Sequence, residues 1–332
     1  MSRKSEARHS VVVANDKLGG AYATLTQRKA HCRNFVNWAF ANGHIFNSLR
    51  DVTFESVKAF IKSRLEDGVS ISTLHNRLSS IRRSMSALGA DPAERNITSA
   101  ALGLGSRDRR GTKEPVPDDV FLAALDKAQA AGHPGFVIML KIERLLGHRG
   151  LEALMSIRDL EQCALEASEA TKLWVPVSNG TKSGRYRETS VILARAEETL
   201  IAIREALVYA HAHKGFLLEG GKDGLKSARA KYHRLARDFG LVGKHSPHSL
   251  RYAYVVEKII EMRDAGLNRQ EAMSMAAMFL GHGARRARYI SMVYGRSIVA
   301  TLKTEKRRPR MRRAIEKLNE LIAAKQIQVG KT

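Results

Sequence analysis

The sequence predicts a mainly α-helical protein of two domains with one small β-sheet, and three observations support this fold class. Apolar residues recur at spacings of three and four over most of the 332 residues, as they do on one face of a helix. Only residues 172–193, "KLWVPVSNGTKSGRYRETSVIL", depart from this period, with β-branched and aromatic residues around the turn pair Asn179-Gly180. Residues 101–116 mix glycines, basic residues and a proline without any period, which is typical of an interdomain linker.

The first domain is expected to be helical over residues 21–100, after a loosely ordered polar arm at residues 1–20. The stretch "TQRKAHCRNFVNWAFANG" ends at Gly43, a residue type that commonly follows a helix. The next stretch, "TFESVKAFIKSRLEDG", begins at Thr53, which is suited to cap a helix. The third, "STLHNRLSSIRRSMSALG", has the most regular apolar stripe: Leu74, Leu78, Ile81, Met85 and Leu88.

The second domain is expected over residues 117–300, with helices near 117–131 and 135–146, then the hairpin, then further helices to about residue 326. Residues 301–332 are strongly basic and form a separate tail with an apolar stripe on a charged helix. Such a stripe docks either on its own domain or on a neighbouring subunit, and the sequence leaves both open. The stripe consists of Ile315, Leu318, Leu321 and Ile322.

The charge of the chain indicates a polyanionic partner. Lys and Arg number 56 against 33 Asp and Glu, so the formal charge is +23 and the pI about 10.3. Such an excess attracts nucleic acid, although a generally adhesive basic protein is the alternative. The two cysteines, Cys32 and Cys163, lie outside any disulfide or zinc spacing, which favours a reducing cytosol. Neither a membrane span nor a signal peptide is expected.

The polar face of the third helix of the first domain is expected to contact double-stranded DNA. It holds several basic residues with short hydroxyl and amide side chains between them and no acidic residue. Side chains of these types bind phosphates and base edges in a major groove. An ordinary solvated face is the alternative. The predicted DNA-binding residues are His75, Arg77, Arg82 and Arg83.

Residues suited to bind a phosphate are concentrated in the second domain. Arg149 lies between apolar flanks in "LLGHRGLEAL", and an enclosed arginine needs an anion, either a ligand or Glu152 in a structural ion pair. In "HSPHSLRYAYVV", His248 and Arg251 share one side of a helix. Pro247 suits a helix start, where free backbone N–H groups favour negative charge. A lone pair of this kind is weak support for a phosphate site.

Taken together, these motifs resemble those of the tyrosine recombinases, the family of phage integrases and chromosome-dimer resolvases. "RGLEAL" resembles the family's arginine and acidic residue, "GTKSGRYRETSVIL" its lysine hairpin with Lys182, "HSLRYAY" its His-x-x-Arg box, and "LGH" its second histidine, His282. The motifs follow the family's order, and the resemblance covers a helical core-binding domain and a catalytic domain. It implies a site-specific recombinase that cleaves and rejoins DNA through a 3′-phosphotyrosyl link without metal, ATP or another cofactor.

The resemblance also implies a role for each catalytic residue. Arg149, Arg251 and His282 would stabilise the charge that develops on the phosphorane. His248 would take the proton of the attacking phenol, and Lys182 would protonate the departing 5′ oxygen.

Two tyrosines compete for the role of nucleophile, because neither lies at the family's usual spacing after His282. Tyr294 in "SMVYG" follows a small apolar residue, as the family's tyrosine does, and "GARRAR" is then a basic insertion. We therefore expect Tyr294, with Tyr289 as the alternative.

The resemblance further implies a homo-tetramer on DNA in the bacterial cytoplasm, associated with the nucleoid, with accessory DNA-bending proteins as candidate partners. Two alternatives stay open at this point. One is a DNA-binding protein of the same fold that has lost the chemistry. The other is a strand transferase similar to type IB topoisomerases or telomere resolvases.

Overall fold

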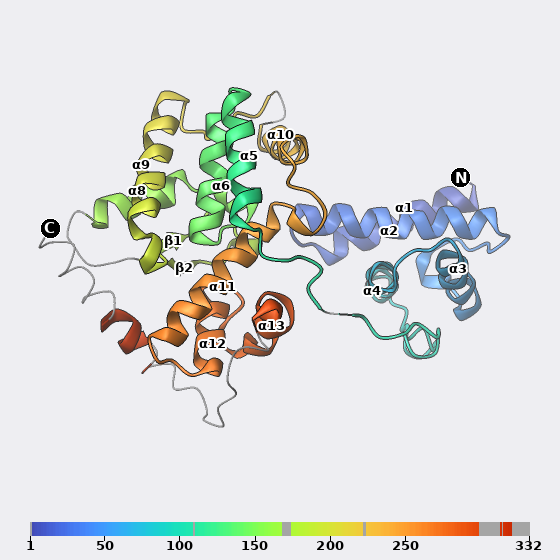
Figure 1. Cartoon of the computed structure of the whole chain (residues 1–332). Coiled ribbons are helices and arrows are strands. Elements are labelled where there is room, and N and C mark those ends of the chain that lie inside the picture. Colours follow the sequence, from blue (N-terminus) through green and yellow to red (C-terminus); the bar gives the residue numbers. More distant parts are fainter. Residues whose placement is uncertain are drawn as a thin grey trace, which may run out of the picture. The chain divides into compact units, whose positions relative to one another are not determined.

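The computed structural model describes residues 2–108, 110–167, 174–221, 224–298, 313 and 315–320. The chain divides into two compact units, Met1–Asp108 and Arg109–Thr332, each with its own core (Figure 1). The division falls inside residues 101–116, the segment that lacks a period in the sequence. The described helices and strands confirm a mainly α-helical chain with one small sheet.

The first unit is helical throughout its regular structure. Its elements are α1 (Arg3–Leu18), α2 (Tyr22–Ala41), the 3₁₀ turn η1 (Leu49–Asp51), α3 (Phe54–Glu66) and α4 (Ile71–Ala87). The predicted stripe of α4 is confirmed, because Leu74, Leu78, Ile81 and Met85 are all buried in the core of this unit. The predicted cap of α3 is confirmed as well, since the Thr53 side chain accepts a hydrogen bond from the Ser56 backbone N–H.

The predicted loose arm at residues 1–20 is wrong, because most of this segment forms α1. The Ser2 side chain caps the helix by accepting a hydrogen bond from the Ser5 backbone N–H. Ala7 and Val11, one helical turn apart, are buried in the core of the first unit. Because this buried stripe is narrow, the period of apolar residues does not predict the helix. Packing against the rest of the first unit stabilises it instead.

Within its described ranges the second unit consists mainly of α-helices, including a helical stretch at residues 315–320, and has a two-stranded antiparallel sheet. The strands pair from Trp174 opposite Ser190 to Val177 opposite Arg187. The elements are α5 (Asp118–Ala130), α6 (Pro134–Leu146), α7 (Gly150–Leu154), α8 (Ile157–Ala167), β1 (Trp174–Val177), η2 (Lys182–Gly184), β2 (Arg187–Ser190), η3 (Leu193–Arg195), α9 (Ala196–Ala212), α10 (Leu225–Asp238), η4 (Gly243–His245), α11 (His248–Asp264), α12 (Arg269–Phe279), η5 (Ala284–Arg286), α13 (Ala287–Val293) and η6 (Gly295–Ser297).

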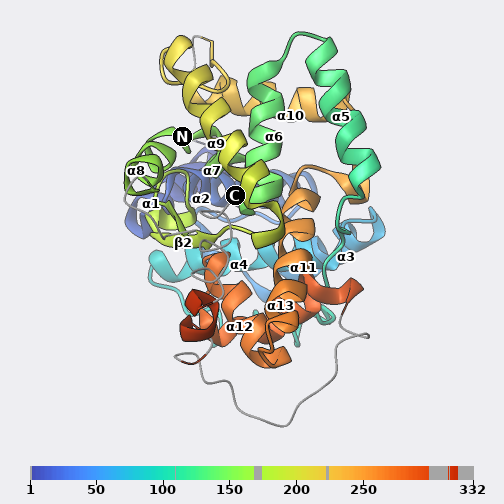
Figure 2. The same cartoon turned by 60° about the vertical axis from the view of Figure 1, so that its left-hand side comes forward.

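Two packed groups of helices position the site in this unit. In the first group α6 contacts both α5 and α9 (Figures 1 and 2). Almost all residues of α6 are buried. In the second group α11, α12 and α13 share a core. The sheet joins the groups, since β1 contacts α8 and β2 contacts α12. No described helix is long and apolar enough to span a bilayer.

The hairpin turn depends on the glycine that the sequence places there. Gly180 has a φ of +70°, in the left-handed region that favours glycine. A Cβ at this position would lie 2.5 Å from the carbonyl oxygen of Leu151, at the start of α7. The turn is therefore packed closely on α7, which keeps the connection to Lys182 near the helix that follows Arg149.

The described part of the C-terminal tail docks on its own unit. Leu318 is buried in the core formed by α11, α12 and α13, and Ile315 packs against it. This is one of the two arrangements that the sequence leaves open. Leu321, Ile322 and most of residues 301–332 lie outside the described residues.

Candidate active site

Glu152 is a buried carboxylate that three arginines share. Its Oε1 lies 2.5 Å from Nη1 of Arg149, and its Oε2 lies 2.7 Å from Nη2 of Arg187 and 3.3 Å from Nη1 of Arg251. The backbone N–H of Arg149 also donates to Oε2. Burial alone would raise the pKa of Glu152, but the three guanidinium groups hold it well below its usual range. Glu152 is therefore ionised and fixed, and the ion pair that the sequence allows between Arg149 and Glu152 is present.

Arg251 lies beneath the site with no exposed surface. Its Nη1 donates to the carbonyl of Gly147 and its Nη2 to the carbonyl of Leu280, each at 2.6 Å. With the contact to Glu152, three of the five N–H groups of the guanidinium are used. Its Nε has no partner among the residues that the structure describes. Burial lowers the pKa of Arg251 to about 10, so it remains a cation at neutral pH.

A pocket of about 430 Å³ opens above these residues and is strongly cationic. Arg149, whose side chain is 28% exposed, presents its charge to this pocket. Thr181 and Gly281 are among its lining residues. Its charged and aromatic lining consists of Arg149, Glu152, Lys182, Arg185, Arg187, Arg286, His282 and Tyr289. With five cations against one carboxylate, the pocket suits a phosphate group.

The two histidines of the site are neutral at pH 7. Partial desolvation lowers the pKa of His248 to about 4, and the charges of Arg251 and Arg149 add to this effect. The same causes, in the same order, lower the pKa of His282 to about 4. His248 begins α11 at the rim of the site, and His282 follows the end of α12. A neutral imidazole can accept a proton, and a bound phosphate would raise both pKa values.

Both candidate tyrosines lie beside the histidines, at different depths. Tyr294 directly follows α13 and is only 3% exposed, with its ring centre 6.0 Å from that of His248 and 6.1 Å from that of His282. Tyr289 is 36% exposed and lines the pocket, and its ring centre lies 4.9 Å from that of His282. Burial and the neighbouring Tyr294 raise the pKa of Tyr289. Cleavage by Tyr294 would require its side chain to move toward the pocket.

The structure therefore places all six predicted catalytic residues in one region. Arg149, Lys182 and His282 line the pocket, Arg251 contacts the Glu152 carboxylate that also lines it, and Tyr294 lies beside His248 and His282. Sequence reasoning did not find Arg187, because its importance depends on a contact with a helix 35 positions away. Within the described ranges no group of three or more His, Cys, Asp or Glu side chains is placed to hold a metal ion.

Another histidine of the second unit, His148, has no surface exposure. Neither of its ring nitrogens has a hydrogen-bond partner among the described residues. Desolvation, and then the charge of Arg187, lower its pKa to about 3, so it is neutral in the folded protein. Buried polar atoms without partners lower stability by about 1–3 kcal/mol each.

We expect His148→Leu to stabilise the protein, by about 1–3 kcal/mol at pH 8. Below pH 6.5 the unfolded chain takes up a proton that buried His148 does not, so the folded state of the unaltered protein loses stability as the pH falls. The gain from His148→Leu should therefore be about 2 kcal/mol larger at pH 5 than at pH 8. Denaturant unfolding of both proteins at pH 5 and pH 8 measures this gain. A His148→Leu protein that is no more stable than the unaltered protein at pH 5 would contradict this account.

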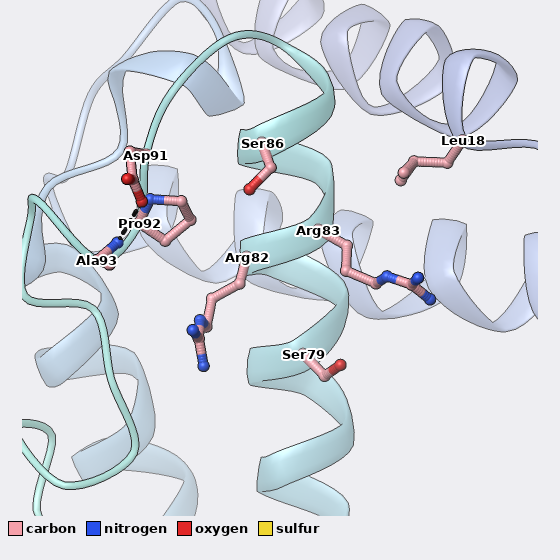
Figure 3. Close-up of a pocket in the computed structure, with 8 residues that line it drawn as sticks. All are labelled: Leu18, Ser79, Arg82, Arg83, Ser86, Asp91, Pro92 and Ala93. Carbon is pink, nitrogen blue, oxygen red and sulfur yellow. Dashed lines mark hydrogen bonds between the residues drawn. The ribbon is translucent and has the colours of Figure 1, made fainter.

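The polar face of α4 in the first unit is only partly as predicted. Arg83 is exposed and Arg82 half-buried, and both line a pocket of about 350 Å³ with Asp91 opposite. Figure 3 shows the two arginines pointing to different sides of α4, with Ser86 above them and Ser79 below them along the helix.

His75, one of the predicted DNA-binding residues, makes two hydrogen-bond contacts within the first unit. Its Nε2 lies 2.8 Å from the carbonyl oxygen of Gly105, and its Nδ1 lies 3.4 Å from Oγ of Ser99. Both ring nitrogens are engaged inside the unit, so His75 stabilises the fold, and its contact with DNA stays a prediction. Arg77 is half-buried, and desolvation and Arg64 lower its pKa.

A second basic surface, which the sequence reasoning missed, lies on α10. This helix buries Ala228, Tyr232 and Leu235, and the opposite face is cationic and solvent-exposed. The helix contacts α7, which follows Arg149, so the basic face lies on an element adjacent to the site. The sequence contains a pattern that predicts this surface, because four basic residues recur on the face opposite the apolar stripe of α10: Lys226, Arg229, Arg234 and Arg237.

The fold and the site together define a two-unit helical protein with a cationic pocket for a phosphate and a tyrosine beside it. Two family models match the chain, "Phage integrase, N-terminal" over residues 3–92 and "Integrase" over residues 103–257. The chain belongs to the phage integrase family of tyrosine recombinases, a family of DNA breaking and rejoining enzymes.

Solved structures share the fold at low sequence identity. The integrase of transposon Tn1549, solved with transposon right end DNA, is 14% identical with a TM-score of 0.52, covering 88% of this chain and 95% of that one. The XerH recombinase in its post-cleavage complex with difH is 18% identical with a TM-score of 0.51, covering 83% and 78%. A lambda integrase tetramer on a Holliday junction is 16% identical with a TM-score of 0.51, covering 84% and 76%. None of the curated protein sequences matches the chain.

Proposed function

We propose that this protein is a site-specific DNA recombinase, an integrase that cleaves and rejoins DNA through a 3′-phosphotyrosyl intermediate. One observation supports this most: the predicted catalytic residues, spread from position 149 to position 294, gather around a single cationic pocket. A scaffold that only binds DNA needs basic surface, but it has no need of neutral histidines beside a tyrosine and a phosphate pocket. The proposed chemistry uses these side chains alone, without metal or ATP.

In the proposed reaction the Oη of Tyr294 attacks the scissile phosphorus. An O–P bond to tyrosine forms, the P–O5′ bond breaks, and the energy of the diester is kept for rejoining. His248 takes the phenolic proton, which is needed because an unperturbed tyrosine has a pKa of about 10. Lys182 gives a proton to the departing 5′ oxygen.

The cations of the site act on the charge that develops during this attack. Arg149 faces the pocket, Arg251 keeps its Nε free, and His282 keeps its Nε2 free among the described residues. Groups of this kind stabilise the five-coordinate phosphorane more than the ground state, because the phosphorane holds more negative charge. Loss of one such donor typically costs about 3 kcal/mol of barrier, or 10²–10³-fold in rate.

The proposed substrate is double-stranded DNA that carries a recombination site. Arg77, Arg82 and Arg83 in the first unit and the basic face of α10 in the second would bind its phosphates, which makes affinity strongly salt-dependent. The lambda integrase forms a tetramer on a Holliday junction. We propose the same state here, in the bacterial cytoplasm on the nucleoid, with accessory DNA-bending proteins as possible partners.

Covalent trapping tests this function. The recognised sequence is obtained first, by selecting bound duplexes from a random-sequence pool. A set of these duplexes is then made with bridging 5′-phosphorothiolate linkages placed at successive positions, so that cleavage releases a thiol that cannot rejoin. We expect labelled DNA to remain attached to the protein after denaturation in detergent, at one linkage position.

The outcomes separate the competing functions. Tight binding without an adduct at any position would show a DNA-binding protein that has lost the chemistry. An adduct together with relaxation of supercoiled plasmids that lack the selected site would favour a type IB topoisomerase. A recombinase should instead exchange strands between two labelled duplexes only when both contain the site.

A further inference from the structure

Arg187 is a buried arginine of the site to which the reaction just described assigns no part. It is the first residue of β2, five positions after Lys182, and its side chain is 4% exposed. Its Nη2 lies 2.7 Å from Oε2 of Glu152, and its Nη1 donates to the carbonyl of Phe279. One guanidinium thus joins the hairpin, α7 and the end of α12.

We propose that Arg187 is a positioning residue for strand cleavage, acting through Glu152 and through the turn that holds His282. The inference rests on the proposed function. Arg187 uses its fork to hold a carboxylate and a carbonyl at once, a geometry that a lysine cannot reproduce.

The first branch of this role concerns Glu152. Both of its oxygens are bound. Nη2 of Arg187 lies 2.7 Å from Oε2, whereas Nη1 of Arg251 lies 3.3 Å from the same oxygen, so Arg187 makes the shorter side-chain contact. Because Glu152 also holds the guanidinium of Arg149, the position of Arg149 at the pocket depends on a carboxylate that Arg187 fixes. A displacement of about 1 Å in such a site can lower a rate about 10²-fold.

The second branch concerns the end of α12. The last carbonyls of a helix have no partner within the helix. Here Arg187 takes the carbonyl of Phe279 and Arg251 takes that of Leu280, just before Gly281 and His282. Gly281 has a φ of +70°, and a Cβ there would lie 3.0 Å from Cδ of Arg187. The turn that delivers His282 to the pocket is therefore built against the Arg187 side chain.

Arg187→Met tests the proposal in single-turnover cleavage of the phosphorothiolate duplex at saturating protein. We expect the rate to fall on the order of 10²-fold while DNA affinity stays unchanged. Arg144→Met is the matched control. Arg144 is equally buried and shares the carboxylate of Glu257 with Arg195, outside the pocket. Its loss should lower the unfolding temperature and leave the cleavage rate unchanged.

Coupling to Glu152 is the readout that a merely structural role would not produce. Because Arg187 acts in part through Glu152, the double variant Arg187→Met with Glu152→Gln should lose clearly less rate than the product of the two single losses. Effects that multiply would overturn the proposal, as would an Arg187→Met protein that cleaves at the unaltered rate.

Two further measurements, on Arg187→Lys and on the unaltered protein, complete the test. If Arg187→Met does not fold, Arg187→Lys keeps the charge and loses the fork, and we expect slow cleavage with unchanged affinity. An unaltered rate for a folded Arg187→Lys would overturn the proposal. Failure of the unaltered protein to form any adduct would overturn the proposed function, a result distinct from equal rates for variant and unaltered protein.

Discussion

Tyr294→Phe is expected to abolish the covalent adduct while leaving DNA binding intact. The substitution removes the oxygen that would attack phosphorus and keeps the ring, which packs 4.5 Å from Tyr252 and is almost fully buried. Loss of the nucleophile of a covalent enzyme costs a factor of about 10⁴ or more. Adduct formation on the phosphorothiolate duplex measures cleavage, and titration of the same duplex without the sulfur measures affinity.

Tyr289→Phe is the matched control, since Tyr289 lies 6.1 Å from Tyr294, ring centre to ring centre, and lines the pocket. We expect this variant to cleave close to the unaltered rate, because its hydroxyl has no part in the proposed proton transfers. The reverse pattern, with an adduct from Tyr294→Phe and none from Tyr289→Phe, would assign the nucleophile to Tyr289. Adducts from both variants would contradict a single nucleophile.

The helical period of apolar residues was sufficient to predict a helix and its buried face where the helix is strongly amphipathic. Leu74, Leu78, Ile81 and Met85 recur on one face of α4, and all four are buried. The period of apolar residues did not predict α1, whose buried face is little more than Ala7, Val11 and Ala14. A helix of this kind is stabilised by what packs on it, and that information lies in distant segments of the chain.

The site shows the same division between local and distant information. Motif order brought Arg149, Lys182, His248, Arg251 and His282 to attention, and the structure places them together. Arg187 was missed because nothing local marks an arginine at a strand start as buried, and only the fold brings Glu152 to it. His75 was included on its residue type, yet its ring is bonded to Gly105. Residue types on a helix face do not reveal which side chains are already engaged.

Lys182→Met is expected to slow cleavage of ordinary DNA by about 10²–10⁴-fold, the range that a general acid contributes. Lys182 is exposed on the hairpin and lines the pocket, so its ammonium can reach a leaving oxygen there. A 5′ alcohol is a poor leaving group without a proton, whereas a thiol, with a pKa of about 8.5, leaves as its anion. The deficit should therefore shrink to within about tenfold on the 5′-phosphorothiolate duplex, where no acid is needed.

The comparison between the two leaving groups separates acid catalysis from any other role of Lys182. A lysine that only binds the phosphate would slow both substrates equally, and that result would contradict the assignment. Lys244→Met is the matched control, because Lys244 is exposed in the same unit and pairs with Glu114 away from the pocket. It should cleave both duplexes at the unaltered rate. Nicked ordinary duplexes and phosphorothiolate duplexes of one sequence, followed in single-turnover reactions, give the four rates that the argument needs.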